Sequence, residues 1–218
     1  MQNLIPLIDA AQLSQQHCKQ QIQSHLAYAT QENFLGRIVK GYHAHATKLC
    51  LMTQNSAKAL CDAQKQLNEK HIGLFVFDAY RPLRATRDFM HWTEQAVAHD
   101  YELERKQIHY PHLEKNQLVH LGYLADGVSN HCFGDTVDLV LIDLKNNNLL
   151  DMGACFDYFD EISHTTATAK QIGEEAYQHR QILSDAMLSV GFTPYEKEFW
   201  HFTFHQRDVD APLDVEIK

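Results

Sequence analysis

The sequence predicts a single α+β domain, with a central antiparallel sheet flanked by helices. Helix-like and strand-like stretches follow one another in unequal blocks, without the regular βαβ alternation of a doubly wound fold. No repeat, low-complexity tract or Pro/Gly/Ser-rich linker divides the 218 residues, so we expect one domain over 1–218. The composition, 44% hydrophobic and 22% charged, is that of a globular chain that buries a core without disulfide or metal cross-links.

A helix and a strand are expected first. The helix begins at Asn55 or Ser56, where a polar side chain can cap it, and ends near Gly73. Its apolar positions have helical spacing and are Ala57, Leu60, Cys61 and Leu67. The next residues, Leu-Phe-Val-Phe at 74–77, read as a buried strand.

A second helix follows Pro82, which suits the first helical position. Its apolar stripe consists of Ala85, Phe89, Trp92 and Ala96, at helical spacing. Residues 137–144 are rich in Val, Leu and Ile and end at the turn-forming asparagines 146–148, so they predict a second buried strand.

The last elements are a long helix and a final strand. Gly191 is placed just after the end of the helix, and residues 200–204 (WHFTF) form the strand. The apolar stripe of the helix is Ile172, Ala176, His179, Leu183, Ala186 and Val190.

Charge and cysteine content exclude several classes of protein. The net charge is −9, from 28 acidic and 19 basic residues, and the basic residues are scattered, which argues against a nucleic-acid or membrane-surface partner. The N-terminus has no basic region followed by a long apolar run, so we expect a cytoplasmic protein. The five cysteines are odd in number and include no CxxC pair, which predicts reduced thiols.

Three stretches contain residues suited to catalysis. In the first, His131 and Asp138 flank Gly134, and a turn there would fold the histidine back towards the aspartate. In the second, Glu198 precedes His201 by three residues, so in a regular strand the two side chains would face opposite ways unless a turn or bulge intervened.

The third stretch, DAYRP at 78–82, follows a predicted strand, where the chain turns and Arg81 can project into a cleft. Taken alone, an Asp78-x-x-Arg81 pattern is more often a structural ion pair. The His-Asp and Glu-x-x-His spacings are equally unspecific when each is taken singly.

Together, the three stretches suggest metal-dependent hydrolysis. Two imidazoles and one carboxylate, here His131, His201 and Asp138, are a typical ligand set of catalytic zinc, which keeps a fourth position for water. Glu198 is then placed to take a proton from that water, and Arg81 to stabilise the developing oxyanion.

The other noted residues have structural interpretations. We expect the pairs His43/His45 and His109/His112 to be surface histidines in polar, loop-like surroundings. The remaining interpretations are a core residue for His179, a surface or supporting residue for His205, and a small buried hydrophobe for Cys132.

Five motifs occur in one order along the chain and cover most of it. They are YATQENFLG at 28–36, DAYRP at 78–82, SNHCFGDTVDL at 129–139, DMGACFD at 151–157 and EFWHF at 198–202. With them, the sequence resembles the zinc D-alanyl-D-alanine dipeptidases of the vancomycin-resistance (VanX-like) type. The first and fourth motifs resemble this dipeptidase branch and not the carboxypeptidase or phage-endolysin branches.

The resemblance implies a D-Ala-D-Ala metallopeptidase, or hedgehog-like, fold with a small, largely enclosed site. It implies one zinc per chain, bound by His131, Asp138 and His201, with Glu198 as general base and Arg81 polarising the scissile carbonyl. It also implies a set of substrate-binding residues for a small dipeptide: Ser129 for the C-terminal carboxylate, and Asp157 and Tyr28 for the free ammonium group.

Some positions depart from the family pattern, and some alternatives stay open. The departures are Asn130, Cys132, Thr136, Phe199 and a long segment at 99–126. The rival functions are a zinc D,D-carboxypeptidase or endopeptidase acting on peptidoglycan stem peptides, and a non-catalytic zinc-binding module of the same fold. The sequence leaves open the oligomeric state, and also whether the role is antibiotic resistance, dipeptide salvage or cell-wall turnover.

Overall fold

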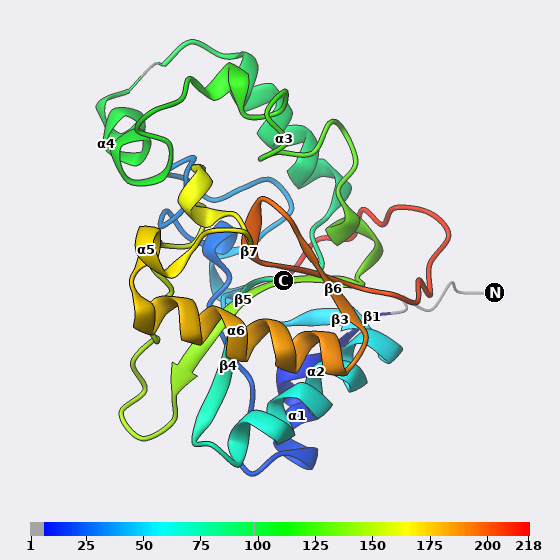
Figure 1. Cartoon of the computed structure of the whole chain (residues 1–218). Helices are drawn as coiled ribbons and strands as arrows, with labels where there is room; N and C mark the ends of the chain where they lie inside the picture. The colour runs from blue at the N-terminus through cyan, green and yellow to red at the C-terminus, as the bar shows by residue number, and fades with distance from the viewer. Residues whose placement is uncertain (1–6, 98) are drawn as a thin grey trace, which may run out of the picture.

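A five-stranded sheet forms the centre of the computed structural model, which describes residues 7–97 and 99–218 (Figure 1). In spatial order, the strands are β2 (Gln23–Ser24), β4 (Ile72–Asp78), β5 (Thr136–Asp143), β7 (Glu198–Phe204) and β6 (Phe192–Tyr195). The pairs β4–β5, β5–β7 and β7–β6 are antiparallel, as expected, whereas β2 runs parallel to β4. The sheet is therefore mixed, because a two-residue strand that the sequence did not reveal is added at one edge.

The remaining elements surround this sheet. A separate two-stranded sheet pairs β1 (Leu7–Asp9) with β3 (Leu51–Thr53). The helices are α1 (Ala10–His17), α2 (Gln54–Asn68), α3 (Leu83–Glu94), α4 (Asp100–His109), α5 (Ala169–Ile172) and α6 (Glu174–Ser189). The short 3-10 helices are η1 (Ala27–Ala29), η2 (Ala44–Ala46), η3 (Lys115–Gln117), η4 (Asn130–Phe133) and η5 (Glu161–Ser163).

One group of helices packs on the sheet, and a second group lies beyond it. Helix α2 contacts β4, α1 and α6, and α6 also contacts β5 and β6. In Figure 1, α3 and α4 lie at the opposite end of the molecule, beyond β7. Strand β5 is buried along nearly its whole length, which explains its continuous apolar run.

An aromatic cluster fills the core near α3. Phe34 contacts Phe89, Trp92 and Phe159 with ring centroids 5.1 to 5.3 Å apart. Tyr28 lies edge-on to Phe89 at 5.0 Å. This cluster supports the side chains that form the site.

The first predicted helix has the correct face but different ends. Its apolar positions are buried, but α2 begins after Thr53 and ends at Asn68. Gly73 does not end it: this glycine lies inside β4, where a Cβ atom would come 2.7 Å from Leu144 Cδ2. The reversal before β4 is made by His71, which has a φ of 57°.

Helix α3 also differs at both ends. Pro82 is its N-cap and not its first residue, and the helix stops at Glu94. Gln95 is extended, with a ψ of 146°, so the predicted stripe ends at Trp92 and Ala96 is exposed.

The predicted long helix is two helices. Gly173, with a φ of 88°, separates α5 from α6. His179 is half-buried, with Nδ1 2.7 Å from the Asp151 carbonyl, and the neighbouring Arg180 takes the buried position. Gly191 does follow the helix as predicted, with a φ of 94°.

Other expectations are confirmed or fall outside the described chain. Strands β5 and β7 occupy the predicted positions to within two residues. The predicted turn after β5 contains Asn147, which has a φ of 59°. The five cysteines, all within the described residues, are free thiols. Among the described helices, none combines the length and the apolar surface needed to cross a bilayer. Residues 1–6, the start of the N-terminus on which the cytoplasmic expectation rests, lie outside the described residues.

Candidate active site

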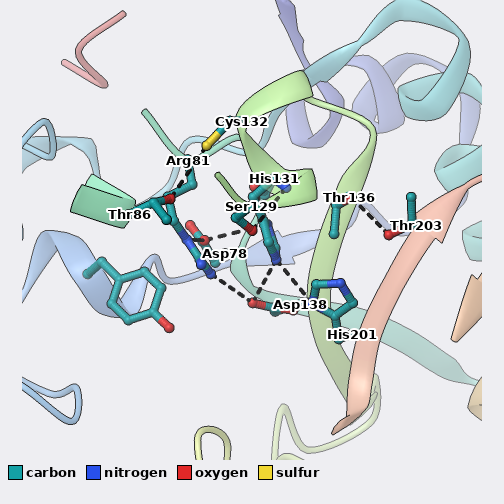
Figure 2. Close-up of polar contacts among 12 residues, drawn as sticks. Asp78, Arg81, Thr86, Ser129, His131, Cys132, Thr136, Asp138, His201 and Thr203 are labelled. Carbon is teal, nitrogen blue, oxygen red and sulfur yellow. Dashed lines mark hydrogen bonds and ion pairs between the residues drawn. The ribbon is translucent and has the colours of Figure 1, made fainter. Parts of the chain in front are cut away.

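The three expected metal-binding residues meet at the centre of the sheet (Figure 2). Asp138 on β5 lies directly opposite His201 on β7, and His131 lies on η4, just before β5. Their ligand atoms all lie within 4.8 Å of one another. The cluster therefore joins two adjacent strands and one short helix.

The turn before β5 depends on Gly134. Its φ of 72° is the left-handed conformation that ends η4, and a Cβ atom here would come 2.5 Å from Leu7 Cδ2. The expected turn that folds His131 back towards Asp138 is confirmed.

Hydrogen bonding fixes the orientation of the His131 ring. Nδ1 lies 2.6 Å from the Ala79 carbonyl, to which it donates, so Nε2 faces Asp138 Oδ2 at 3.2 Å. His201 presents Nδ1, which lies 3.3 Å from His131 Nε2 and 3.0 Å from Asp138 Oδ1. Two imidazole nitrogens and both carboxylate oxygens thus converge on one point.

This donor set fits a divalent metal ion. Asp138 Oδ1 is buried, and among the described residues it has no hydrogen-bond donor of suitable geometry. Burial lowers the pKa of His201, which keeps its ring neutral, the form that binds metals. Although burial opposes it, the neighbouring His131 and His201 rings hold the pKa of Asp138 below its usual value, so this carboxylate is ionised.

Glu198 lies beside the cluster and is not a member of it. Its Oε2 is 3.6 Å from His201 Nδ1, although the two residues are three apart in the chain. The register between β6 and β7 shifts at this point, because Pro194 pairs with Phe202 while Tyr195 pairs with Glu198. This irregularity is the bulge that the sequence analysis required for the two side chains to share one site.

The Glu198 carboxyl is primed to exchange a proton. Burial, reinforced by the charges of Asp138 and Asp157, raises its pKa well above the usual value. A raised pKa makes the carboxylate form of this residue a stronger base towards a proton donor in the cavity.

Arg81 is held by two carboxylates on the other side of the cluster. Its Nε donates to Asp78 Oδ2 at 2.9 Å, and its Nη2 lies 3.4 Å from Asp138 Oδ2 (Figure 2). The guanidinium also stacks over the rings of Tyr28 and Phe89, at 5.1 and 5.0 Å. The structural ion pair considered from the sequence is therefore present, and it fixes an arginine that also lines the cavity.

Tyr28 and Asp157 form a buried pair. The Tyr28 hydroxyl donates to Asp157 Oδ2 at 2.9 Å. Burial, with the added charge of Asp138, raises the pKa of Asp157 well above its usual value, although the hydrogen bond from Tyr28 opposes this rise. A cationic partner that enters the cavity would favour the ionised form of this carboxyl group.

Ser129 has a local structural role and also lines the cavity. It is the N-cap of η4, and its hydroxyl oxygen accepts a hydrogen bond from the His131 amide at 3.3 Å. The hydroxyl proton is not used by this bond and can be donated to a ligand.

These side chains line a cavity of about 360 Å³. Seven of the candidate residues line it: Tyr28, Arg81, Ser129, Asp138, Asp157, Glu198 and His201. His131 is fully buried and does not line the cavity. The rest of the lining consists of Val119, residues 122–126, Val128, Asn130 and Tyr195. The structure therefore brings all eight candidate residues together.

Sequence reasoning missed the supporting residues. Tyr42 donates to Asp78 Oδ1 at 2.7 Å, and Tyr195 lines the cavity with its ring centroid 5.6 Å from that of His201. His109 was expected at the surface and is buried, which corrects that interpretation, whereas His112 is exposed. The adjacent Tyr110 and Pro111 indicate an ordered helix end, the one local signal that the sequence offered.

Comparison with known proteins identifies the family of this chain. A family model described as D-ala-D-ala dipeptidase (peptidase M15) matches residues 10–216. A D-alanyl-D-alanine dipeptidase of Enterococcus faecalis is 38% identical over 175 residues, which is 80% of this chain and 82% of the relative. Proteins of the same name from Enterococcus faecium and Streptomyces coelicolor are 34% and 35% identical, over 85% and 82% of this chain and 86% and 84% of their own lengths.

Proposed function

Because the chain belongs to the peptidase M15 family of D-Ala-D-Ala dipeptidases, we propose that it hydrolyses D-Ala-D-Ala, or a closely related D,D-dipeptide, to free amino acids. The observation that supports this most is the convergence on one small cavity of the His/Asp/His cluster, Glu198, Arg81 and Asp157.

We propose one zinc ion per chain, held by His131, Asp138 and His201. When bound, the metal would supply Lewis acidity, polarising the scissile carbonyl and making a water molecule easier to deprotonate. The hydrogen bond from His131 Nδ1 to Ala79 keeps the donor nitrogen of this ring pointing into the site.

Glu198 serves as the general base. Its carboxylate accepts a proton from the attacking water molecule as the new C–O bond forms. It then gives that proton to the leaving nitrogen as the amide C–N bond breaks, so the residue ends the cycle in its starting state. The position of Oε2, 3.6 Å from His201 Nδ1, is close enough to the cluster for this transfer.

Arg81 stabilises the charge that develops on the carbonyl oxygen. Its guanidinium is ion-paired with Asp78 and stacked on two aromatic rings, so it is already oriented before substrate arrives. A preorganised donor of this kind costs no rearrangement in the transition state.

The two ends of a dipeptide carry opposite charges, and the cavity offers a partner for each. Asp157, held by Tyr28, would pair with the free ammonium group, and Ser129 would donate to the carboxylate. A pocket that recognises both ends also selects for substrate length. A cytoplasmic location stays a prediction from the sequence.

The test is release of free alanine from D-Ala-D-Ala, with L-Ala-L-Ala and a stem pentapeptide measured alongside. We expect rapid release from D-Ala-D-Ala alone. Equal or faster cleavage of the pentapeptide would favour the carboxypeptidase, and no cleavage of any substrate by the zinc-loaded protein would favour the non-catalytic module.

A further inference from the structure

The C-terminal end of α4 contacts the loop that carries Asp157. This helix belongs to the long segment 99–126, and it ends at His109, a buried residue that takes no part in the mechanism above. Three contacts join the two stretches of chain. The His109 ring donates from Nδ1 to the Asp157 carbonyl at 3.1 Å, the Phe159 amide donates to the His109 carbonyl at 2.7 Å, and Cys155 Sγ lies 3.8 Å from the Ile108 carbonyl.

The backbone at Asp157 has an unusual conformation. Its φ is 58°, and among the described residues it shares a positive φ with just two other non-glycine residues, His71 and Asn147. Those two lie next to strands, whereas Asp157 lies in the wall of the cavity, in a turn that the Tyr158 amide closes by donating to the Cys155 carbonyl at 3.3 Å. A left-handed conformation in an L-residue persists where the surroundings hold it in place.

Side-chain packing anchors the neighbours of Asp157, and hydrogen bonds at both of its polar atoms hold the peptide between Asp157 and Tyr158. Phe156 stacks on Phe77 with ring centroids 4.6 Å apart, and Phe159 packs in the aromatic core. The carbonyl of Asp157, between these anchors, accepts its hydrogen bond from His109. If this bond were lost and the turn shifted, the Asp157 Cα would move and its carboxylate would lose its alignment with the Tyr28 hydroxyl.

We propose that His109 is a positioning residue that holds the Asp157 peptide, and through it the Asp157 carboxylate, in the orientation that selects substrates with a free N-terminal ammonium group. The proposal rests on the role given to Asp157 in the proposed function. The proposal gives the end of α4 a function. The segment 99–126 carries a side chain, His109, that holds the loop containing Asp157 in place by a hydrogen bond.

The test compares variants that keep or remove the donor at the Nδ1 position. The amide nitrogen of His109→Asn falls near the place of Nδ1, whereas that of His109→Gln falls nearer Nε2, and His109→Leu has no donor. All three variants keep the main-chain bond from Phe159. The matched control is His112→Leu, three residues away and exposed.

The readout is the ratio of kcat/KM for D-Ala-D-Ala to that for N-acetyl-D-Ala-D-Ala, together with the split between kcat and KM. For His109→Leu we expect KM for the free dipeptide to rise and the ratio to fall, each about tenfold, as for the loss of one buried hydrogen bond. The kcat and the metal content should change little. His109→Asn and His112→Leu should keep the wild-type ratio.

A residue with a merely structural role would lower the rates for both substrates together, so an unchanged ratio in folded His109→Leu would overturn the proposal. If His109→Leu does not fold, the test is the comparison of His109→Asn with His109→Gln. A kcat/KM ratio that is near wild type for His109→Asn and lowered for His109→Gln supports the proposal. Equal ratios for these two variants overturn it. Absence of any preference in the wild-type protein would instead overturn the role of Asp157, and this inference with it.

Discussion

Asp138 and His201 face each other across β5 and β7, with Oδ1 3.0 Å from Nδ1. The register of two central strands fixes the relative position of these two residues, so it does not depend on a flexible loop. His131 is added from the turn that precedes β5. The cluster is therefore part of the sheet, and the sheet should survive the loss of the metal.

The first prediction follows from that placement. Purified protein should hold about one zinc per chain, and chelation should abolish activity while leaving the far-ultraviolet circular dichroism nearly unchanged, since a chain of this size folds without a metal. Metal analysis checks the assignment. Stoichiometric zinc that persists after simultaneous substitution of His131, Asp138 and His201 by Ala would show that the metal binds elsewhere.

The second prediction concerns Glu198. The Glu198→Gln variant should keep its zinc and lose roughly 10² to 10⁴-fold in kcat, with a much smaller change in KM, because proton transfer occurs in the transition state. The exposed Glu196, two residues earlier, provides the matched control Glu196→Gln, which should retain normal turnover. Loss of zinc in Glu198→Gln would make Glu198 a ligand instead of a base.

The third prediction separates the two roles of Arg81. Arg81→Ala should lower kcat by roughly 10² to 10³-fold and also destabilise the protein by about 3 to 5 kcal/mol, because Asp78 is left as an unpaired buried charge. Arg81→Lys should recover part of the stability but little of the kcat, since lysine lacks the planar fork.

Steady-state kinetics and chemical denaturation measure both effects. Arg87→Ala, which removes an exposed arginine six residues away, should change neither quantity much. Normal turnover in Arg81→Lys would mean that a charge alone is sufficient and that the guanidinium geometry is not used.

The fourth prediction is a pH dependence of stability. Burial lowers the pKa of His109 to about 4, below the 6.5 of an exposed histidine. Between these values the unfolded chain binds the proton and the folded chain does not, so the stabilisation is complete above pH 6.5 and is lost as the pH falls towards 4. The loss attributable to His109 is roughly 3 kcal/mol.

The comparison that isolates this contribution is between wild type and His109→Asn, unfolded by denaturant at pH 7 and pH 4.5. The wild-type protein should lose more unfolding free energy over this interval, because the side-chain amide of the variant does not titrate. Parallel curves for the two proteins would show that His109 is not buried as a neutral ring.

Parts of the fold with strong local patterns could be predicted from the sequence. All residues of β5 except the last are buried, and the buried residues of α2 recur at helical spacing. Both patterns are visible in the sequence as regular apolar positions. Strand β2 could not be predicted, because its two residues are a strand through pairing with the distant Phe75 and Val76. The break at Gly173 and the placement of Gly73 inside β4 show that one residue type, glycine, serves in turns, breaks and close packing.

The sequence motifs identified the eight candidate site residues. They did not identify the residues that hold these side chains in place. Glu198 and His201 share a face through a register shift that no spacing rule reveals. His109 looked like one of two loop histidines, because its burial results from packing against a loop almost fifty residues away.

The measurement that tests the account most directly is kcat/KM for D-Ala-D-Ala against kcat/KM for N-acetyl-D-Ala-D-Ala, both with the zinc-loaded wild-type protein. Acetylation removes the ammonium group and leaves Asp157 buried without a cationic partner, so the free dipeptide should be cleaved at least about a hundredfold more efficiently. Equal values for the two substrates would contradict a dipeptidase that recognises a free N-terminus and would favour a carboxypeptidase acting on stem peptides.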